Sequence, residues 1–351
     1  MSNLSNQQIN QTFNGLLQVP GGVTSALQTV QEGNGASTQL KVSTTQVQVG
    51  LVNSGDILQV PGGVTSQLKT VYDGDNVATG LQISTTGINA AYAQQDYGSY
   101  ANYVESQTMT WIAHRGGAGM APEDTMSSFA NGIALGSKII ECDVQISLDN
   151  VPVIIHDSTV DRTTNGTGAV AALNYYSYMR GLDAGSFFNA KFSDSYIPTL
   201  DEYFALCRAR NALAMPEIKG YKTQSNIQLM LDSMNNNNCQ PITCWQSFNF
   251  SDLQYVRNLD ATVSLAYLYT PTTQAQLDTV IAQLIALGGP VELACSYSTV
   301  LANPSITWVS STSAANIKLT VWTVDSPYIA KQLMDLGINR IMSNYYLGSI
   351  I

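Results

Sequence analysis

Residues 138–157 read KIIECDVQISLDNVPVIIHD, two apolar runs of strand length joined by the four residues SLDN. A crossover between parallel strands needs about a dozen residues or more, so this short connection predicts an antiparallel hairpin. Glu141 and Asp143 lie two positions apart on the first run, and their side chains therefore share one face of the strand.

Further strand candidates on both sides of this hairpin alternate with helix candidates. The strand candidates are MTWIAH, ALAMPEIK, ITCWQSF, VSLAYLY, VELACSY, LTVWTVD and RIMSN, and the helix candidates include MSSFANGIALG, LDEYFALCRAR, IQLMLDSMN, QAQLDTVIAQLIALG and YIAKQLMDLG. Apolar strands separated by helices predict an α/β fold with a mostly parallel sheet. About eight such units fit a (β/α)₈ TIM barrel over residues 108–351, which the hairpin makes irregular.

The first ninety residues contain an internal duplication. LLQVPGGVTSALQTVQEGNGASTQLKVSTTQVQV begins at Leu16 and returns as ILQVPGGVTSQLKTVYDGDNVATGLQISTTGINA from Ile57, an offset of 41 residues. Alternating apolar and polar residues around glycine turns predict a β-rich repeat module at residues 1–90, followed by a linker at residues 91–107. Each copy is too short to close a core alone. Either the copies pack on each other or three chains share one core, and we expect the second arrangement, a homotrimer.

Composition narrows the class of protein. The net charge of −10 argues against a nucleic-acid partner, which would need a basic face. No signal peptide is visible in MSNLSNQQINQTF, and no apolar run reaches the roughly 18 residues of a transmembrane segment. The 5 cysteines show no metal-binding spacing, so we expect buried free thiols.

Charged side chains follow the predicted strands at their carboxyl ends, where barrel enzymes place their working residues. Three carboxylates, Glu141, Asp143 and Glu217, provide oxygen ligands that suit Mg²⁺ or Ca²⁺. The alternative is that these acids form salt bridges with Arg115 and Lys219.

The two histidines of the chain, His114 and His156, also follow predicted strands. Beside a cation they could act as general base and general acid. Arg115 and Lys219 add the positive charge that a phosphoryl group requires. Together these residues indicate phosphodiester cleavage. Asp157 could orient His156 or a turn, and we leave it outside the catalytic set.

Motifs spread over residues 110–347 resemble those of the glycerophosphodiester phosphodiesterase family. They are HRG with APEDT, ECDVQISLDNVPVIIHD, DRTTNGTG, IPTLDE, PEIK, QSF and VWTVD, in the family's order. The resemblance implies a barrel related to phosphatidylinositol-specific phospholipase C that uses a divalent cation. It also implies attack on phosphorus by a neighbouring substrate hydroxyl, through a cyclic phosphate, with release of an alcohol.

The same resemblance assigns roles to individual residues. It implies acid/base work for His114 and His156, and phosphate contacts for Arg115 and Lys219. Metal ligation would fall on three carboxylates: Glu141, Asp143 and Glu217.

Two motifs depart from the family pattern. PENT becomes Pro122–Thr125 with Asp124 in place of the amide, and GVDGIITD becomes GINRIMSN, which introduces Arg340 and Asn344. Neither change removes a predicted ligand or acid/base histidine. We expect the glycines after Arg115 to leave room for a phosphate beside the backbone.

The N-terminal duplication resembles repeats in the shafts and attachment regions of bacteriophage tail fibres and related virion proteins. The resemblance implies a virion protein that contacts other virion proteins through residues 1–90, and release by lysis fits the lack of a visible signal peptide. The barrel would then cleave phosphodiesters of host surface polymers or lipids. The alternative is a non-catalytic structural or receptor-binding fibre protein whose barrel binds host surface glycans.

Overall fold

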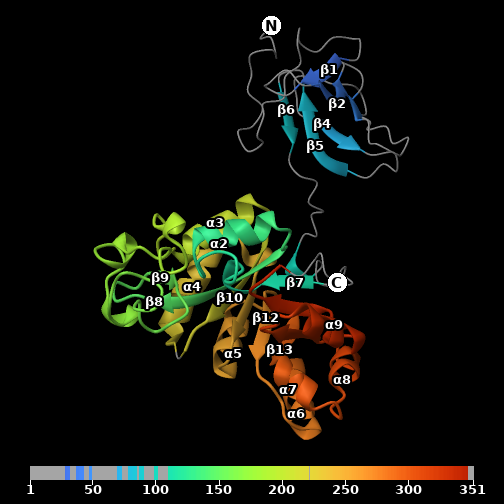
Figure 1. Cartoon of the computed structure of the whole chain (residues 1–351). Helices are drawn as coiled ribbons and strands as arrows, with labels where there is room; N and C mark the ends of the chain where they lie inside the picture. Colours follow the sequence, from blue (N-terminus) through green and yellow to red (C-terminus); the bar gives the residue numbers. More distant parts are fainter. Residues whose placement is uncertain are drawn as a thin grey trace. The chain divides into compact units, whose positions relative to one another are not determined.

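The computed structural model describes residues 28–31, 37–42, 47–49, 69–72, 78–84, 87–90, 99–101, 110–220 and 222–346 (Figure 1). The chain divides into two compact units, Met1–Asp96 and Tyr97–Ile351. The rest of the predicted module at residues 1–90, and most of the predicted linker at residues 91–107, lie outside the described residues.

Six strands are described in the first unit, in two three-stranded antiparallel sheets. The first holds β1 (Gln28–Gln31), β2 (Ser37–Val42) and β3 (Val47–Val49), and the second holds β4 (Lys69–Tyr72), β5 (Ala78–Ser84) and β6 (Gly87–Ala90). Gln28 pairs with Val42 in one sheet, and Lys69 pairs with Ile83 in the other. Strand pairing therefore repeats with the period of the sequence duplication.

Eight parallel strands close a barrel in the second unit. They are β7 (Thr110–Ala113), β8 (Ile139–Ile146), β10 (Leu213–Ile218), β11 (Cys244–Ser247), β12 (Ser264–Leu268), β13 (Val291–Ser296), β14 (Lys318–Trp322) and β15 (Arg340–Ser343). Pairing of β15 with β7 and of β8 with β10 completes the ring. Strand β9 (Pro152–Ile154) pairs antiparallel with β8. The predicted barrel and its hairpin are both confirmed.

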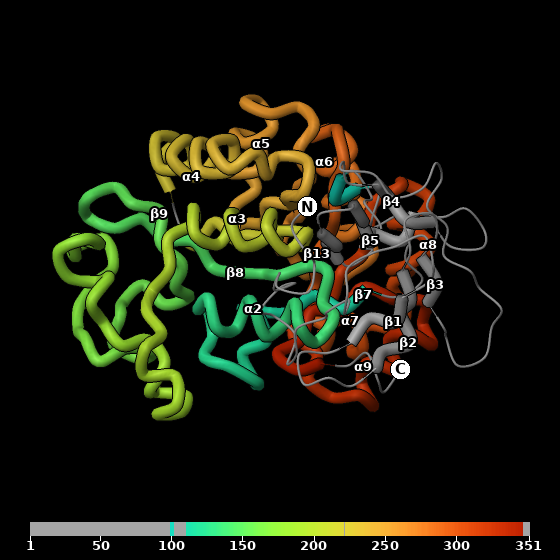
Figure 2. Tube along the Cα trace, turned by 90° about the horizontal axis from the view of Figure 1, so that it is seen from above, coloured from blue at the N-terminus to red at the C-terminus, as the bar shows by residue number. Residues whose placement is uncertain are grey.

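Helices surround these strands. They are α2 (Met126–Ala134), α3 (Leu200–Ala209), α4 (Gln224–Asn236), α5 (Phe250–Leu259), α6 (Gln274–Leu287), α7 (Tyr297–Ala302), α8 (Trp308–Ala314) and α9 (Pro327–Asp335). Thr125, Thr199 and Thr223 cap α2, α3 and α4 by accepting a hydrogen bond from the backbone N–H three residues later. Figure 2 shows α3, α4 and α5 following one another around the outside of the barrel.

A lobe with its own small core fills the connection from β9 to α3, residues 155–199 (Figure 1). It contains three short 3₁₀ turns: η3 (Val170–Ala172), η4 (Met179–Gly181) and η5 (Ala190–Phe192). Val160, Tyr175 and Met179 are among the buried residues of its core. This packing holds the segment that follows His156 against the barrel.

The amino-terminal half of the barrel interior contains a buried ion pair. Nη2 of Arg340 lies 3.0 and 2.9 Å from the two carboxylate oxygens of Glu292, and it donates to the Tyr100 hydroxyl at 3.0 Å. Nε of Arg340 donates to Thr320 at 3.1 Å. Tyr100, which belongs to the segment predicted as a linker, is only 1% exposed. Arg340 therefore belongs to an ion pair inside the barrel. It does not lie at the carboxyl-terminal face, where the predicted site residues follow the strands.

All 5 cysteines are buried free thiols. Among the described residues, none of the helices has the length and apolar character needed to cross a membrane.

Candidate active site

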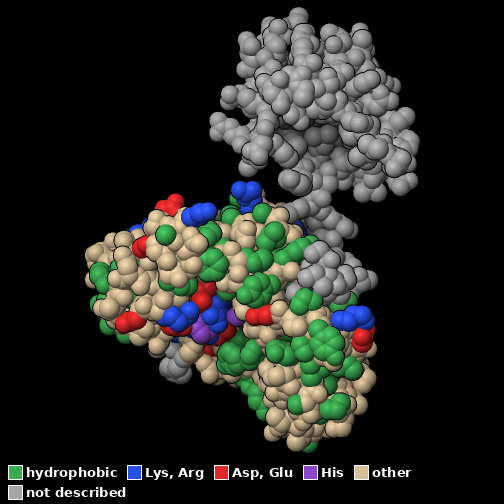
Figure 3. All heavy atoms as spheres, in the orientation of Figure 1, with side chains coloured by type: hydrophobic (Ala, Val, Ile, Leu, Met, Phe, Trp, Pro, Cys, Tyr) green, Lys and Arg blue, Asp and Glu red, His purple; other side chains and the backbone are tan. Residues whose placement is uncertain are grey.

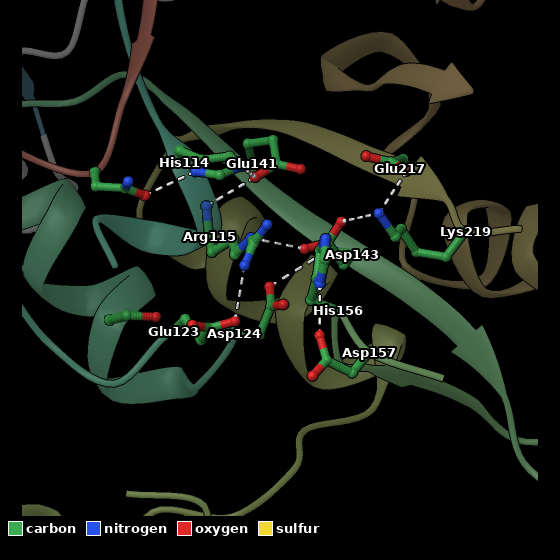
Figure 4. Close-up of polar contacts among 12 residues, drawn as sticks. His114, Arg115, Glu123, Asp124, Glu141, Asp143, His156, Asp157, Glu217 and Lys219 are labelled. Atoms are coloured by element: carbon green, nitrogen blue, oxygen red, sulfur yellow. Dashed lines mark hydrogen bonds and ion pairs between the residues drawn. The ribbon is translucent and has the colours of Figure 1, made fainter. Parts of the chain in front are cut away.

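The predicted site residues meet at the carboxyl ends of neighbouring strands (Figure 4). His114 follows β7 and begins the short turn η2 (His114–Gly116), and His156 follows β9. Glu141 and Asp143 point from β8, where Asp143 pairs in register with Glu217 of β10. Figure 3 shows basic and acidic side chains gathered around the histidines on this face.

The three carboxylates form a buried cluster. One oxygen from each of Glu141, Asp143 and Glu217 lies within 4.8 Å of the others. Burial, with the charge of Asp143 as the next cause, raises the pKa of Glu141 well above its usual value and that of Glu217 to about 7. Full ionisation of the cluster would place more negative charge there than its surroundings neutralise, so Glu141 and Glu217 keep their protons to a higher pH than usual.

Two bases compensate part of this charge. Nε of Arg115 lies 3.1 Å from Asp143, and Nζ of Lys219 lies 3.4 Å from Asp143 and 2.9 Å from Glu217. Burial opposes ionisation of Asp143, but Lys219 and then Arg115 outweigh it and lower the pKa of that carboxyl. The salt bridges that the sequence left open as an alternative are therefore present at Asp143 and Glu217.

Glu141 is held differently. It accepts hydrogen bonds from the backbone N–H of Arg115 at 2.7 Å and from Nε2 of Gln246 at 3.0 Å. Arg115 presents this N–H from a left-handed backbone conformation with φ of 51°. Among the described residues, no lysine or arginine side chain forms an ion pair with Glu141.

The donor set fits a hard divalent cation. Oδ2 of Asp143 and Oε1 of Gln246 are buried without a hydrogen-bond partner, although Arg115 approaches Asp143 as an ion pair. Carboxylate oxygens are the ligand type that Mg²⁺ and Ca²⁺ prefer. Glu141, Asp143 and Glu217 could therefore bind a metal ion.

His114 is largely buried, and its ring is neutral at neutral pH. Its Nδ1 lies 2.7 Å from Oδ1 of Asn344, and its Nε2 lies 4.0 Å from Glu141. Burial, followed by the nearby positive charge of Arg115, lowers the pKa of His114 to about 4. At neutral pH the ring can accept a proton.

His156 is more exposed and has an anionic partner. Its Nδ1 lies 2.7 Å from Asp157, which accepts from Nε of Arg162 at 2.7 Å. The hydrogen bond from Arg162 is the main cause that lowers the pKa of Asp157 well below its usual value. Asp157, itself fixed by Arg162, therefore orients the His156 ring.

Arg162 joins the two halves of the site. It donates to Glu123 at 2.7 Å, and Glu123 in turn accepts from Arg115 at 2.9 Å. Sequence reasoning did not single out Arg162 or Glu123. Their only signal was membership of the motifs DRTTNGTG and APEDT. Asp157, left outside the catalytic set, contacts His156 directly.

Asp124, the first departure from the family pattern, lies directly beside the cluster. One of its oxygens accepts from the backbone N–H of Asp143 at 3.3 Å, and the other is buried without a partner. Burial, followed by repulsion from Asp143, raises the pKa of Asp124 well above its usual value.

The expectation for the glycines after Arg115 was wrong. A Cβ on Gly116 would lie 2.5 Å from the Ser128 side chain, and one on Gly119 would lie 2.3 Å from the ring of Tyr345. The space beside these glycines is filled by protein rather than left for a phosphate. They allow η2 and the following loop to pack closely against α2 and the end of the barrel.

Comparison with known proteins agrees with this geometry. Residues 114–346 match the model of the glycerophosphoryl diester phosphodiesterase family. A glycerophosphodiester phosphodiesterase of Caldanaerobacter subterraneus subsp. tengcongensis is 32% identical over 240 residues, which cover 66% of this chain and 93% of that protein.

Solved structures show the same barrel. An Oleispira antarctica phosphodiesterase, in complex with the product sn-glycerol-3-phosphate, is 27% identical with a TM-score of 0.62 and covers 69% of this chain and 96% of its own. A glycerophosphodiester phosphodiesterase from Agrobacterium tumefaciens has the same fold, with 23% identity, a TM-score of 0.57 and coverage of 69% of this chain and 100% of its own. Because the family model spans more than half of the sequence, the chain belongs to the glycerophosphoryl diester phosphodiesterase family and is a phosphoric diester hydrolase.

Proposed function

We propose that the barrel hydrolyses glycerophosphodiesters with a divalent cation, Ca²⁺ or Mg²⁺, held by Glu141, Asp143 and Glu217. The observation that carries this proposal is a cluster of three buried carboxylates that share only two bases, beside the two histidines. The product in the Oleispira antarctica complex, sn-glycerol-3-phosphate, supports a glycerophosphodiester as the substrate class.

The histidines divide the proton transfers. A substrate hydroxyl next to the phosphate attacks phosphorus and gives its proton to Nε2 of His114. The bond from phosphorus to the leaving oxygen breaks, and His156 protonates the departing alcohol. Water then opens the cyclic phosphate by the reverse proton transfers. Arg115 and Lys219 contact the phosphoryl oxygens, and a bound cation would neutralise charge on them.

We also propose that this activity belongs to a homotrimeric virion protein, outside the cell after lysis. Residues 1–90 would bind other virion proteins, and the barrel would cleave phosphodiesters of host surface polymers or lipids. The tail-fibre resemblance of the repeated sequence supports this role, and the paired strands that recur with the same period are compatible with it.

Purified full-length protein tests the reaction. With glycerophosphocholine and Ca²⁺ or Mg²⁺, we expect ³¹P NMR to show sn-glycerol-3-phosphate, and we expect EDTA to abolish its formation. Asp335→Asn, in an exposed pair with Lys331 on α9, is a matched charge control that should retain full activity. Turnover that is indifferent to EDTA would contradict the proposed metal.

Light scattering tests the assembly, because one chain has a mass of 37.8 kDa. We expect three times this mass for the full chain, and a monomeric mass would contradict the homotrimer. A panel of host surface polymers, incubated with the protein and the cation, would identify the substrate. Binding without product from any of them would favour the non-catalytic alternative.

A further inference from the structure

Asp325 and Asn344 lie behind His114, after strands β14 and β15. Oδ2 of Asp325 accepts from Nδ2 of Asn344 at 2.7 Å, and Oδ1 accepts from the backbone N–H of Asn344 at 2.9 Å. The hydroxyl of Ser343 donates to the same Oδ1 at 3.1 Å. Three hydrogen bonds therefore fix the Asp325 carboxylate although it lies at the surface.

These contacts determine which way the Asn344 amide faces. An ionised carboxylate only accepts hydrogen bonds, so the amide nitrogen must point toward Asp325. The amide oxygen then points toward Nδ1 of His114, 2.7 Å away. Because an amide oxygen only accepts, Nδ1 of His114 must carry the hydrogen.

The tautomer of His114 follows from this chain of contacts. In a neutral imidazole with its hydrogen on Nδ1, Nε2 has the free lone pair. Nε2 is the nitrogen that faces the carboxylate cluster, 4.0 Å from Glu141. The basic atom of the ring is thus directed toward the place where a phosphodiester would bind.

We propose that Asp325 and Asn344 are a positioning pair that holds His114 in the tautomer with a basic Nε2. The role of His114 as base rests on the proposed function, whereas its tautomer does not. The neutral amide also distinguishes His114 from His156, whose partner Asp157 is anionic.

Exchanging the two side chains tests the pair. In Asp325→Asn the amide of Asn344 is free to turn its nitrogen toward His114, and in Asn344→Asp two carboxylates face each other across a 2.7 Å contact. We expect kcat to fall about 10- to 100-fold in each variant, with a smaller change in KM. The double variant restores one donor and one acceptor in the right order, so we expect it to recover the tautomer. Its kcat should recover only in part, because a carboxylate then faces Nδ1 of His114 in place of the neutral amide. Asp335→Asn is the matched control.

A spectroscopic measurement reads the tautomer directly. The chain has only 2 histidines, so ¹⁵N-histidine labelling gives two sets of ring signals, which His156→Gln assigns. We expect the wild-type protein to show Nδ1 of His114 protonated and Nε2 unprotonated, a mixture in Asp325→Asn, and the wild-type pattern in the double variant.

The outcomes separate the two proposals. A proton on Nε2 of His114 in the wild-type protein would overturn the positioning pair, even if the enzyme is active. So would single variants with wild-type activity and tautomer. An inactive protein with the expected tautomer would contradict the proposed function and leave the pair standing.

Discussion

In the described part of the barrel, one buried cluster of charge lies in each half. In the amino-terminal half, Arg340 and Glu292 form a one-to-one ion pair. Arg340 also donates to Tyr100 and Thr320, and only its Nη1 is buried without a partner. In the carboxyl-terminal half, a three-carboxylate cluster shares Arg115 and Lys219, and burial raises the pKa of two of its acids.

The difference shows how buried charge can be assigned a role. When two buried groups of opposite charge hydrogen-bond to each other, their attraction offsets the free energy of desolvation within the protein. Breaking such a pair therefore changes the stability of the fold. A surplus of one sign remains costly until something else binds, which marks a site for a ligand of the opposite sign. Changes in the two clusters should therefore affect different measurements.

The largest effect is expected at the histidines of the carboxyl-terminal half. His114→Ala and His156→Ala should each lower kcat by about 10²- to 10⁴-fold, because each removes one proton transfer. Initial rates with glycerophosphocholine and thermal melts would check this, and the melts should stay close to the wild type. Full activity in either variant would show that the histidine is not an acid/base group.

The next effect is expected at the balanced pair. Glu292→Gln leaves Arg340 buried without its anion and should lower the free energy of unfolding by about 3–5 kcal/mol. All 4 tryptophans lie in the barrel unit, so their fluorescence follows barrel unfolding in urea.

The control for this change replaces both partners. Arg340→Met with Glu292→Leu should lose less stability than the single variant, since no unpaired charge remains. If Glu292→Gln is as stable as the wild type, or if it folds but loses kcat, the two clusters do not have separate roles in stability and catalysis.

A smaller effect concerns pH and the carboxylate surplus. The folded protein raises the pKa of Glu217 from 4.5 to about 7, so it holds this proton more tightly than the unfolded chain does. The stability contributed by that proton is present below pH 4.5 and is lost as the pH rises to 7. In EDTA, the wild type should therefore lose about 3 kcal/mol relative to Glu217→Gln across this range, since one pKa unit corresponds to about 1.4 kcal/mol.

Comparing the wild type with Glu217→Gln cancels the titrations of groups that do not interact with Glu217, including that of His114, whose lowered pKa acts with the opposite sign. Urea unfolding at pH 4.5 and 7.5 measures the difference. If the stability of the two proteins changes equally with pH, folding does not raise the pKa of Glu217. Added Ca²⁺ or Mg²⁺ should stabilise the wild type more than Glu217→Gln.

The smallest effect is expected at Tyr100. Tyr100→Phe removes one hydrogen bond to Arg340 while both bonds to Glu292 remain, and it should cost about 1 kcal/mol without changing kcat. The same fluorescence assay measures it. A much larger loss would mean that Tyr100, rather than Glu292, is the main partner of Arg340.

Local patterns predicted the barrel well where they were strong. The short connection after β8 allowed only a hairpin, and the apolar runs marked every barrel strand. Helices α5, α7 and α8 were not among the helix candidates. FSDLQYVRNL mixes its apolar positions with many polar ones, and the other two helices are short. Their packing against strands, rather than their own periodicity, defines them.

The sequence by itself determined the strand order, the placement of polar residues at strand ends and the membership of the family, because each depends on spacing along the chain. Only the tertiary structure showed that Arg162 joins Glu123 to Asp157, and that Asp325 orients Asn344 behind His114. These partners come from separate loops, and hydrogen bonds depend on distances and directions that no local pattern encodes. For the same reason, only the folded barrel shows which buried charges are balanced and which are not.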